Sequence, residues 1–198
     1  MKNIVIIGGS KGIGNAILLQ QLKNNKVFNI SRNAPEITHA NLTHFSLNVL
    51  EDALPEIENI DTLIYCPGSI NLKPIGSLSV EDFRNDFEIN VIGAVKAIQK
   101  YLPTLKKGID PSIVLFSTVA VKLGMPYHAS IAASKAGVEG LVKSLGAELA
   151  SVIRINAIAP TITETTLAAG ILRNDRMKEN MVERHPMKGY LEPEEVAS

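Results

Sequence analysis

Residues 2–22 read KNIVIIGGSKGIGNAILLQQL, and this stretch decides the fold. The apolar run from Lys2 to Ile7 predicts a buried strand, and the run from Asn15 to Leu22 has the composition of a helix. Between them lies a glycine turn with the spacing GxxxGxG, in which Gly8 adopts backbone angles that other residues avoid and Gly14 allows close helix–strand packing. The helix N-terminus then points at a bound anion, so the stretch predicts a cradle for a nucleotide phosphate.

Composition favours one domain and a small ligand. The chain has 198 residues, 45% of them hydrophobic, which suffices for a full core. Twenty basic and twenty acidic residues cancel, and no basic stripe with interleaved aromatics is present, so neither nucleic acid nor an anionic membrane is an expected partner. The single cysteine, Cys66, suits a reducing cytoplasm, and the apolar run 4–7 is too short for a signal peptide or membrane span. We expect a cytoplasmic protein without a metal site.

Short runs rich in Val, Ile and Leu alternate with longer segments of helical period. The expected strands are 3–7, 27–31, 43–47, 62–66, 112–116 and 154–157; the expected helices are 12–24, 51–56, 79–102 and 129–150. Strands that are apolar on both faces and joined by helical crossovers imply a parallel sheet covered on both sides. The prediction is an α/β, Rossmann-like, doubly wound sheet in a single domain, residues 1–198.

The long helix 79–102 carries two local signals. Ser79 followed by Asp82 indicates an N-cap with an acidic residue in the first turn. Asn90 interrupts an apolar segment, which suggests that its amide points inward, needs buried partners and kinks the helix.

Six motifs, in order, resemble those of the short-chain dehydrogenase/reductase family over nearly the whole chain. IGGSKGIG (7–14) is similar to the family's TGxxxGIG loop, DTLIYCPG (61–68) to its DxLVNNAG turn and FEINVIGA (87–94) to its helix asparagine segment. LFSTVA (115–120), ASKAGVEGL (133–141) and RINAIAPTITET (154–165) resemble the strand-five serine, the active-site helix and the cofactor loop after strand six. Cys66 and Pro67 replace the asparagine and alanine of the family's turn, and we interpret Cys66 as a small core residue.

The resemblance implies a working set of Asn, Ser, Tyr and Lys. In the family the Tyr hydroxyl protonates a carbonyl oxygen while a nicotinamide delivers a hydride, and the Lys charge lowers the pKa of the Tyr. Asn90 and Lys135 match two of these positions, and Thr118 stands at the Ser position with its hydroxyl retained. The Tyr position, one helical turn before Lys135, holds Ile131, which cannot transfer a proton.

Three explanations of Ile131 remain open. The general acid is relocated to Tyr127 or His128, which lie just before the active-site helix; or a water held by Thr118, Lys135 and Asn90 supplies the proton; or the chain performs no redox chemistry. A lost general acid costs about 10²–10⁴ in rate, so slow catalysis is compatible with the substitution.

Strand two ends without the acidic residue of NAD-specific relatives. Ser31 and Arg32 stand there, and Lys11 adds a second positive charge, so the resemblance favours NADP(H) over NAD(H). Asn48 is expected at the adenine edge. The remaining cofactor-binding residues implied by the resemblance are Gly8, Ser10, Gly12, Ile13, Gly14, Lys135, Pro160, Thr163 and Thr165.

LEPEEVAS (191–198) resembles the start of the family's last large helix, so we expect a C-terminal strand to be missing, and segment 167–186 to be a substrate lid. The family associates through its counterparts of the helices at 79–102 and 129–150, which implies a homodimer or homotetramer. The expected function is NADPH-dependent reduction of a carbonyl, either a 3-oxoacyl thioester or a small ketone. The alternative is an NADP(H)-binding regulatory or scaffold subunit.

Overall fold

Six parallel strands form one sheet in the order β3-β2-β1-β4-β5-β6. The computed structural model describes residues 1–198, apart from the side chain of Arg184. The strands are β1 (Asn3–Ile7), β2 (Lys26–Ser31), β3 (Leu42–Ser46), β4 (Thr62–Tyr65), β5 (Ser112–Phe116) and β6 (Arg154–Ile158). Because β1 pairs with both β2 and β4, the strand order reverses beside β1, and ligands of such sheets bind at the carboxyl ends of the strands at that point.

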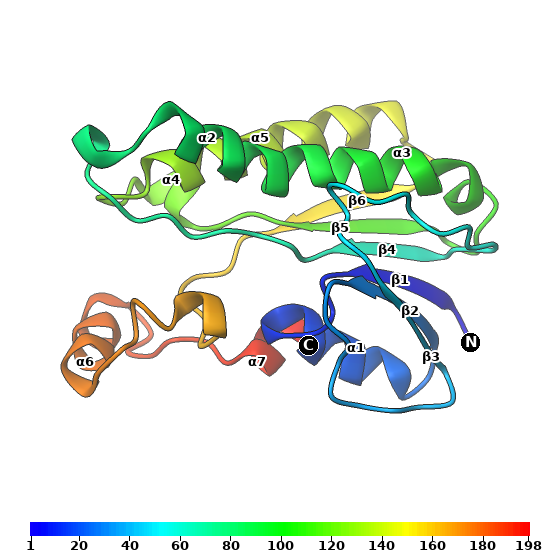
Figure 1. Cartoon of the computed structure of the whole chain (residues 1–198), viewed down its shortest axis with the longest axis horizontal. Coiled ribbons are helices and arrows are strands. Elements are labelled where there is room, and N and C mark those ends of the chain that lie inside the picture. The colour runs from blue at the N-terminus through cyan, green and yellow to red at the C-terminus, as the bar shows by residue number, and fades with distance from the viewer.

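Helices cover both faces of the sheet. They are α1 (Gly12–Leu22), α2 (Val80–Phe87), α3 (Gly93–Leu105), α4 (Ala120–Leu123), α5 (Ala129–Glu148), α6 (Asp175–Arg184) and α7 (Pro193–Ala197), with short turns η1 (Ile75–Ser77), η2 (Glu88–Ile92) and η3 (Thr166–Ala168). Figure 1 shows α2, α3 and α5 on one face and α1 and α7 on the other. Each face has its own apolar core, centred on residues such as Leu63 and Tyr101 on the first and Ile6 and Leu18 on the second. The predicted doubly wound sheet is thus confirmed.

The expected strands agree with the observed ones to within a residue at each end. The predicted cap of α2 is also present: Asp82 N donates to Ser79 Oγ at 3.1 Å, and Ser79 N donates to Asp82 Oδ2 at 2.8 Å. This reciprocal pair satisfies two of the backbone N–H groups that every helix start leaves free.

The helix predicted at 51–56 is wrong, because the crossover from β3 to β4 contains no helix. Asp52 N donates to the Asn48 carbonyl oxygen at 2.8 Å, as in a helical turn, but no further turn follows it. Pro55 stops any continuation, and its carbonyl accepts from Tyr101 Oη instead.

The long helix predicted at 79–102 is interrupted at Asn90, as its sequence suggests. The interruption is a π-helical turn, η2, between α2 and α3. Tyr65 Oη donates to the Ile89 carbonyl oxygen at 2.6 Å. A Cβ at Gly93 would lie 2.1 Å from that hydroxyl, so the Tyr65 side chain fits only because residue 93 is glycine.

None of the described helices has the length and apolar composition needed to cross a bilayer.

Candidate active site

The glycine turn between β1 and α1 has the geometry of a phosphate cradle. Gly8 and Gly12 have φ angles of 82° and 54°, in the left-handed region. A Cβ at Gly14 would lie 2.3 Å from the Gly8 carbonyl oxygen, so a side chain there would push α1 off the turn. No side chain caps α1, which leaves the N–H groups of its first turn, Gly12 to Gly14, available to an anion. Ser10 lies in the turn itself, and Ile13 packs against the core beneath it.

A buried asparagine holds this turn from below. Asn29 on β2 is fully buried, and its Oδ1 accepts the Gly9 N–H at 2.9 Å. Its Nδ2 donates to Ser31 Oγ at 3.0 Å and to His44 Nδ1 at 3.1 Å. Asn29 is not among the site residues predicted from the motifs, although a polar residue in a buried strand is itself a signal.

The loop after β6 reaches the same turn. A Cβ at Gly12 would lie 3.2 Å from Thr165 Cγ2, so Thr165 stands directly beside the cradle. Thr165 Oγ1 accepts from Ala168 N at 3.2 Å and caps η3, while the buried Thr163 donates to the Thr161 carbonyl at 3.0 Å. The Pro160 carbonyl accepts from Val119 N, which ties this loop to the end of β5.

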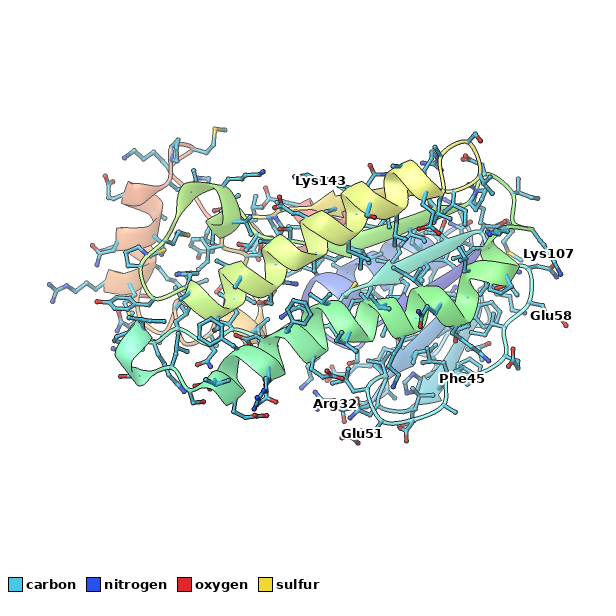
Figure 2. All side chains as sticks on the ribbon, turned by 90° about the horizontal axis from the view of Figure 1, so that it is seen from above. Arg32, Phe45, Glu51, Glu58, Lys107 and Lys143 are labelled. Carbon is cyan, nitrogen blue, oxygen red and sulfur yellow. The ribbon has the colours of Figure 1, made fainter. Side chains whose placement is uncertain are left out.

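The end of β2 presents Arg32 to solvent. Arg32 is exposed beyond the strand end (Figure 2), and none of the described carboxylates forms a salt bridge with it. Lys11, at the start of α1, is also exposed. Ser31 is buried, and its hydroxyl donates to the Asn33 carbonyl at 2.9 Å. Asn48 uses its Oδ1 on Leu50 N and keeps its NH₂ group as a donor.

Asn90 and Lys135 lie together at the carboxyl end of β4. A Cβ at Gly68 would be 3.3 Å from Asn90 Oδ1 and 3.6 Å from Lys135 Nζ, so both polar atoms flank this glycine. Asn90 Nδ2 donates to the Asp86 carbonyl at 2.7 Å, to Ser69 Oγ at 3.1 Å and to Ser134 Oγ at 3.3 Å. Its Oδ1 is buried without a partner among the described residues.

Lys135 is a buried cation. Its side chain is 8% exposed, and Nζ donates to the Phe116 carbonyl at 2.8 Å. Burial lowers the pKa of Lys135 to about 8, although Cys66 and Asp86 act in the opposite direction. The neighbouring Cys66 is half-buried and packs against the core on the α1 side, and desolvation of its thiol raises its pKa to about 12.

Ile131 lies one helical turn before Lys135 and is only 5% exposed, within the packed interior. Thr118, at the end of β5, accepts from Ala120 N at 3.3 Å and keeps its own proton to donate. A donor hydroxyl is therefore present at the Ser position, and an apolar side chain at the Tyr position.

Tyr127 and His128 line a pocket of about 550 Å³ between the segment 73–75 and the start of α5. Tyr127 has a φ of 68° and is 60% exposed. His128 Nδ1 lies 2.7 Å from the Pro126 carbonyl oxygen, which can only accept, so Nδ1 carries a proton. The other three predicted catalytic residues, Asn90, Thr118 and Lys135, do not line this pocket.

A buried carboxylate escaped the sequence analysis. Asp86 on α2 is 3% exposed, and Ser69 Oγ donates to its Oδ1 at 2.5 Å. Ser130 and Ser134 on α5 are each 1% exposed. The signal was available, because Asp86 lies four residues before Asn90 and therefore on the same stripe of the helix.

The chain is similar in sequence to known oxidoreductases. The family described as enoyl-(acyl carrier protein) reductase matches residues 44–198. The chain belongs to the short-chain dehydrogenase/reductase family, whose members are NAD(P)-dependent oxidoreductases. It is 24% identical to the 3-oxoacyl-(acyl-carrier-protein) reductase FabG of Staphylococcus epidermidis, over 100% of this chain and 88% of that protein. It is 28% identical to a tropinone reductase homolog of Arabidopsis thaliana, over 100% of this chain and 82% of that protein.

Solved structures show the same fold. The ligand-free aldohexose dehydrogenase of Thermoplasma acidophilum aligns with a TM-score of 0.87 at 25% identity, over 99% of this chain and 84% of that one. ElxO with NADP bound aligns with a TM-score of 0.83 at 25% identity, over 99% of this chain and 88% of ElxO. A variant of ElxO in which one tyrosine is replaced by phenylalanine, with NADPH bound, aligns with a TM-score of 0.84 at the same identity and coverage.

Proposed function

We propose that this protein is an NADPH-dependent reductase of a carbonyl group. The observation that carries the proposal is the pair of Asn90 and Lys135, both buried beside Gly68 at the point where the strand order of the sheet reverses. Asparagine and lysine side chains are costly to bury in this way unless something uses them. The glycine cradle lies at the same edge of the sheet, at the end of β1.

The residues present fit a dinucleotide. The glycine turn leaves its first-turn N–H groups free for the pyrophosphate, and Thr165 stands beside Gly12 where it can add a hydroxyl. When bound, NADPH supplies the hydride that reduces the carbonyl. Lys135 offers further donors beyond the one used on Phe116, and Thr118 offers a hydroxyl to the substrate oxygen.

The preference for NADPH rests on Arg32 and Lys11. Both are exposed, and Arg32 has no carboxylate partner among the described side chains, so its guanidinium is free for a ribose phosphate. The NADP-bound and NADPH-bound structures of ElxO are in line with this assignment.

For the substrate we propose a 3-oxoacyl thioester or a small ketone. The pocket beside Tyr127 is lined mainly by apolar groups, among them Pro74, Ile75 and Met125, and such a lining suits an acyl or alkyl chain. The name of the FabG relative and the description of the matching family point in the same direction. By the resemblance, the protein works in the cytoplasm as a homodimer or homotetramer.

The test is NADPH fluorescence on titration with the protein, followed by NADPH oxidation on adding 3-oxoacyl thioesters and simple ketones. We expect NADPH binding and slow turnover, because the absence of the tyrosine lowers the rate by a factor of about 10²–10⁴ while the cofactor and substrate are still held in position. The variants Tyr127→Phe and His128→Ala separate the two pocket residues as proton donors. Absence of NADPH binding would refute the proposed function.

A second candidate function is favoured by Ile131. An apolar, buried residue at the tyrosine position leaves the cradle intact while removing the usual general acid. This combination suits an NADP(H)-binding regulatory or scaffold subunit. NADPH binding without turnover on any carbonyl of the panel would favour this function over the first.

A further inference from the structure

Several buried polar side chains lie in the same region as Lys135, and three of their atoms have no hydrogen-bond partner among the described residues. Among the described residues, Asp86 Oδ2, Asn90 Oδ1 and Ser130 Oγ are buried and form no hydrogen bond. Asp86 is nevertheless fixed, because Ser69 donates to its other oxygen. A buried carboxylate with a hydrogen bond to only one of its oxygens destabilises the fold, which suggests that Asp86 is kept for a function.

The helices place these groups together. Figure 2 shows α5 lying alongside α2 and α3 over the sheet. The chain segments that contain α3 and α5 each connect neighbouring parallel strands on the same face, so the two helices run in the same direction. Ser134 touches Asn90, and one turn earlier on each helix stand Ser130 and Asp86. The unpaired hydroxyl and the unpaired carboxylate oxygen therefore both belong to the contact between α2 and α5.

Lys135 has the right chemistry for proton transfer. Only one of its three N–H groups is assigned, to the Phe116 carbonyl, and the ammonium lies beside Gly68 at the proposed reaction centre. The two candidate acids in the pocket are less suitable, because Tyr127 is mostly exposed and His128 Nδ1 donates its proton in a hydrogen bond to the Pro126 carbonyl oxygen.

We propose that Lys135 itself is the proton donor of this site, and that Asp86 is a positioning residue, the buried counter-charge that keeps Lys135 protonated. The proposal rests on the proposed reductase function. In this proposal Lys135 has the role that the family assigns to tyrosine, and the burial of Asp86 is explained by its charge.

In the proposed step, bound NADPH would supply a hydride that forms a C–H bond to the carbonyl carbon as the nicotinamide C–H bond breaks, and it would leave as NADP⁺. The C=O π electrons move to oxygen, which takes one proton as an N–H bond of the Lys135 ammonium breaks. Lys135 is left as a neutral amine and regains a proton from solvent water. The sum is carbonyl, NADPH and one proton giving alcohol and NADP⁺.

The charged surroundings of Lys135 are few. The Cys66 thiol and the Asp86 carboxylate both act to raise the pKa of Lys135 against the dominant effect of burial. Because the pKa of Cys66 is itself about 12, the thiol is uncharged where Lys135 titrates, and Asp86 is the charged group of the two. On α5 itself the next carboxylate, Glu139, is engaged by Ser117 and Lys122. Removing the Asp86 charge should therefore lower the pKa of Lys135 further, and Lys135 should lose its proton at lower pH.

The first experiment compares Lys135→Arg with wild type. Arginine keeps the positive charge but does not release a proton in this pH range. We expect NADPH binding to persist and turnover to fall by about 10²–10⁴. Turnover at the wild-type level in Lys135→Arg, or its loss in Tyr127→Phe or His128→Ala, would overturn the assignment of Lys135 as donor.

The second experiment compares Asp86→Asn with Glu81→Gln, an exposed carboxylate on the same helix. In Asp86→Asn the alkaline limb of kcat should move to lower pH by at least about half a unit, while Glu81→Gln leaves it in place. An unchanged alkaline limb in Asp86→Asn would overturn the role of Asp86.

A readout without turnover separates this proposal from the proposed function. Between pH 6 and 9 we would record the unfolding midpoint in urea, where deprotonation of Lys135 appears as an increase in stability. The onset of that increase should lie at lower pH in Asp86→Asn than in wild type and Glu81→Gln. The same onset in all three would refute the counter-charge even in a protein that turns over no substrate, whereas absent NADPH binding with a shifted onset would refute only the reductase.

Discussion

Lys135 and Cys66 share one buried corner of the site and change stability with pH in opposite directions. The pKa of Lys135 is lowered to about 8 from its ordinary 10.5, and that of Cys66 is raised to about 12 from 9.0, in both cases chiefly by burial. Above pH 8 the unfolded chain binds more protons at Lys135 than the folded one, so stability rises with pH. Above pH 9.0 the folded chain binds more protons at Cys66, so stability falls.

We therefore predict a rise of the unfolding free energy between pH 8 and 9, with a slope of up to about 1.4 kcal/mol per pH unit, and a plateau from pH 9 to about 10. In Cys66→Ala the rise should continue beyond pH 9. In Lys135→Met it should vanish and leave only the fall. Urea titrations across this range measure all three, and a wild-type curve that falls from pH 8 to 9 would contradict the burial of Lys135.

Arg32 carries the cofactor prediction at the same scale. Arg32→Ala should weaken NADPH binding by about tenfold or more, the effect of losing a charged hydrogen-bond pair to phosphate, and leave NADH binding nearly unchanged. Fluorescence titrations with both cofactors measure the two affinities. Equal weakening of both would show that Arg32 does not bind the ribose phosphate.

Glu36→Gln is the matched control for Arg32→Ala. Glu36 is an exposed charged residue close to Arg32 in the chain, so the substitution changes a neighbouring charge without removing the guanidinium. It should leave the ratio of the two affinities unchanged.

At the scale of elements, the turn η2 depends on one glycine. Tyr65 Oη reaches the Ile89 carbonyl, and the space for it exists because Gly93 has no side chain. The π-helical turn in turn sets the point where Asn90 leaves the regular helix and enters the buried cluster. π-helical turns inside helices occur frequently at functional sites.

Gly93→Ala should destabilise the fold by about 2–4 kcal/mol, from overpacking and from loss of the Tyr65 hydrogen bond. Gly140→Ala is the matched control, because nothing lies within 4 Å of a Cβ at that helical position. There alanine should stabilise by about 0.5–1 kcal/mol. Urea midpoints of the two variants should thus move in opposite directions, and a neutral Gly93→Ala would contradict the packing of Tyr65.

Some of the helices and strands could be predicted from local sequence signals, and others could not. Strands that are apolar on both faces, and the pair Ser79 and Asp82, are local signals, and the structure confirms them. The segment 51–56 is not a helix, because the turn that begins at Asn48 ends at Asp52 and Pro55 lacks the N–H that would continue it. The spacing of Asp86 and Asn90 places them on one stripe of the helix, but the burial of Asp86 follows only from the contact between α2 and α5.

At the scale of the whole molecule, the sheet order brings distant motifs to one edge. The glycine turn follows β1, Gly68 follows β4, and the loop with Thr165 follows β6, yet Thr165 contacts Gly12. The motifs predicted this convergence through a family resemblance. Tyr127 and His128 line a pocket just before α5, and its shape depends on the left-handed φ of Tyr127, which motif spacing does not encode.

The most direct test of the central claim is transfer of deuterium from NADPH labelled at the reactive carbon of nicotinamide. Purified protein is incubated with labelled NADPH and a panel of 3-oxoacyl thioesters and ketones, and the alcohol product is examined by mass spectrometry. The account predicts deuterium on the carbinol carbon, at a rate that Lys135→Arg strongly reduces. Protein that binds NADPH but leaves every carbonyl of the panel unlabelled and unreduced would contradict it.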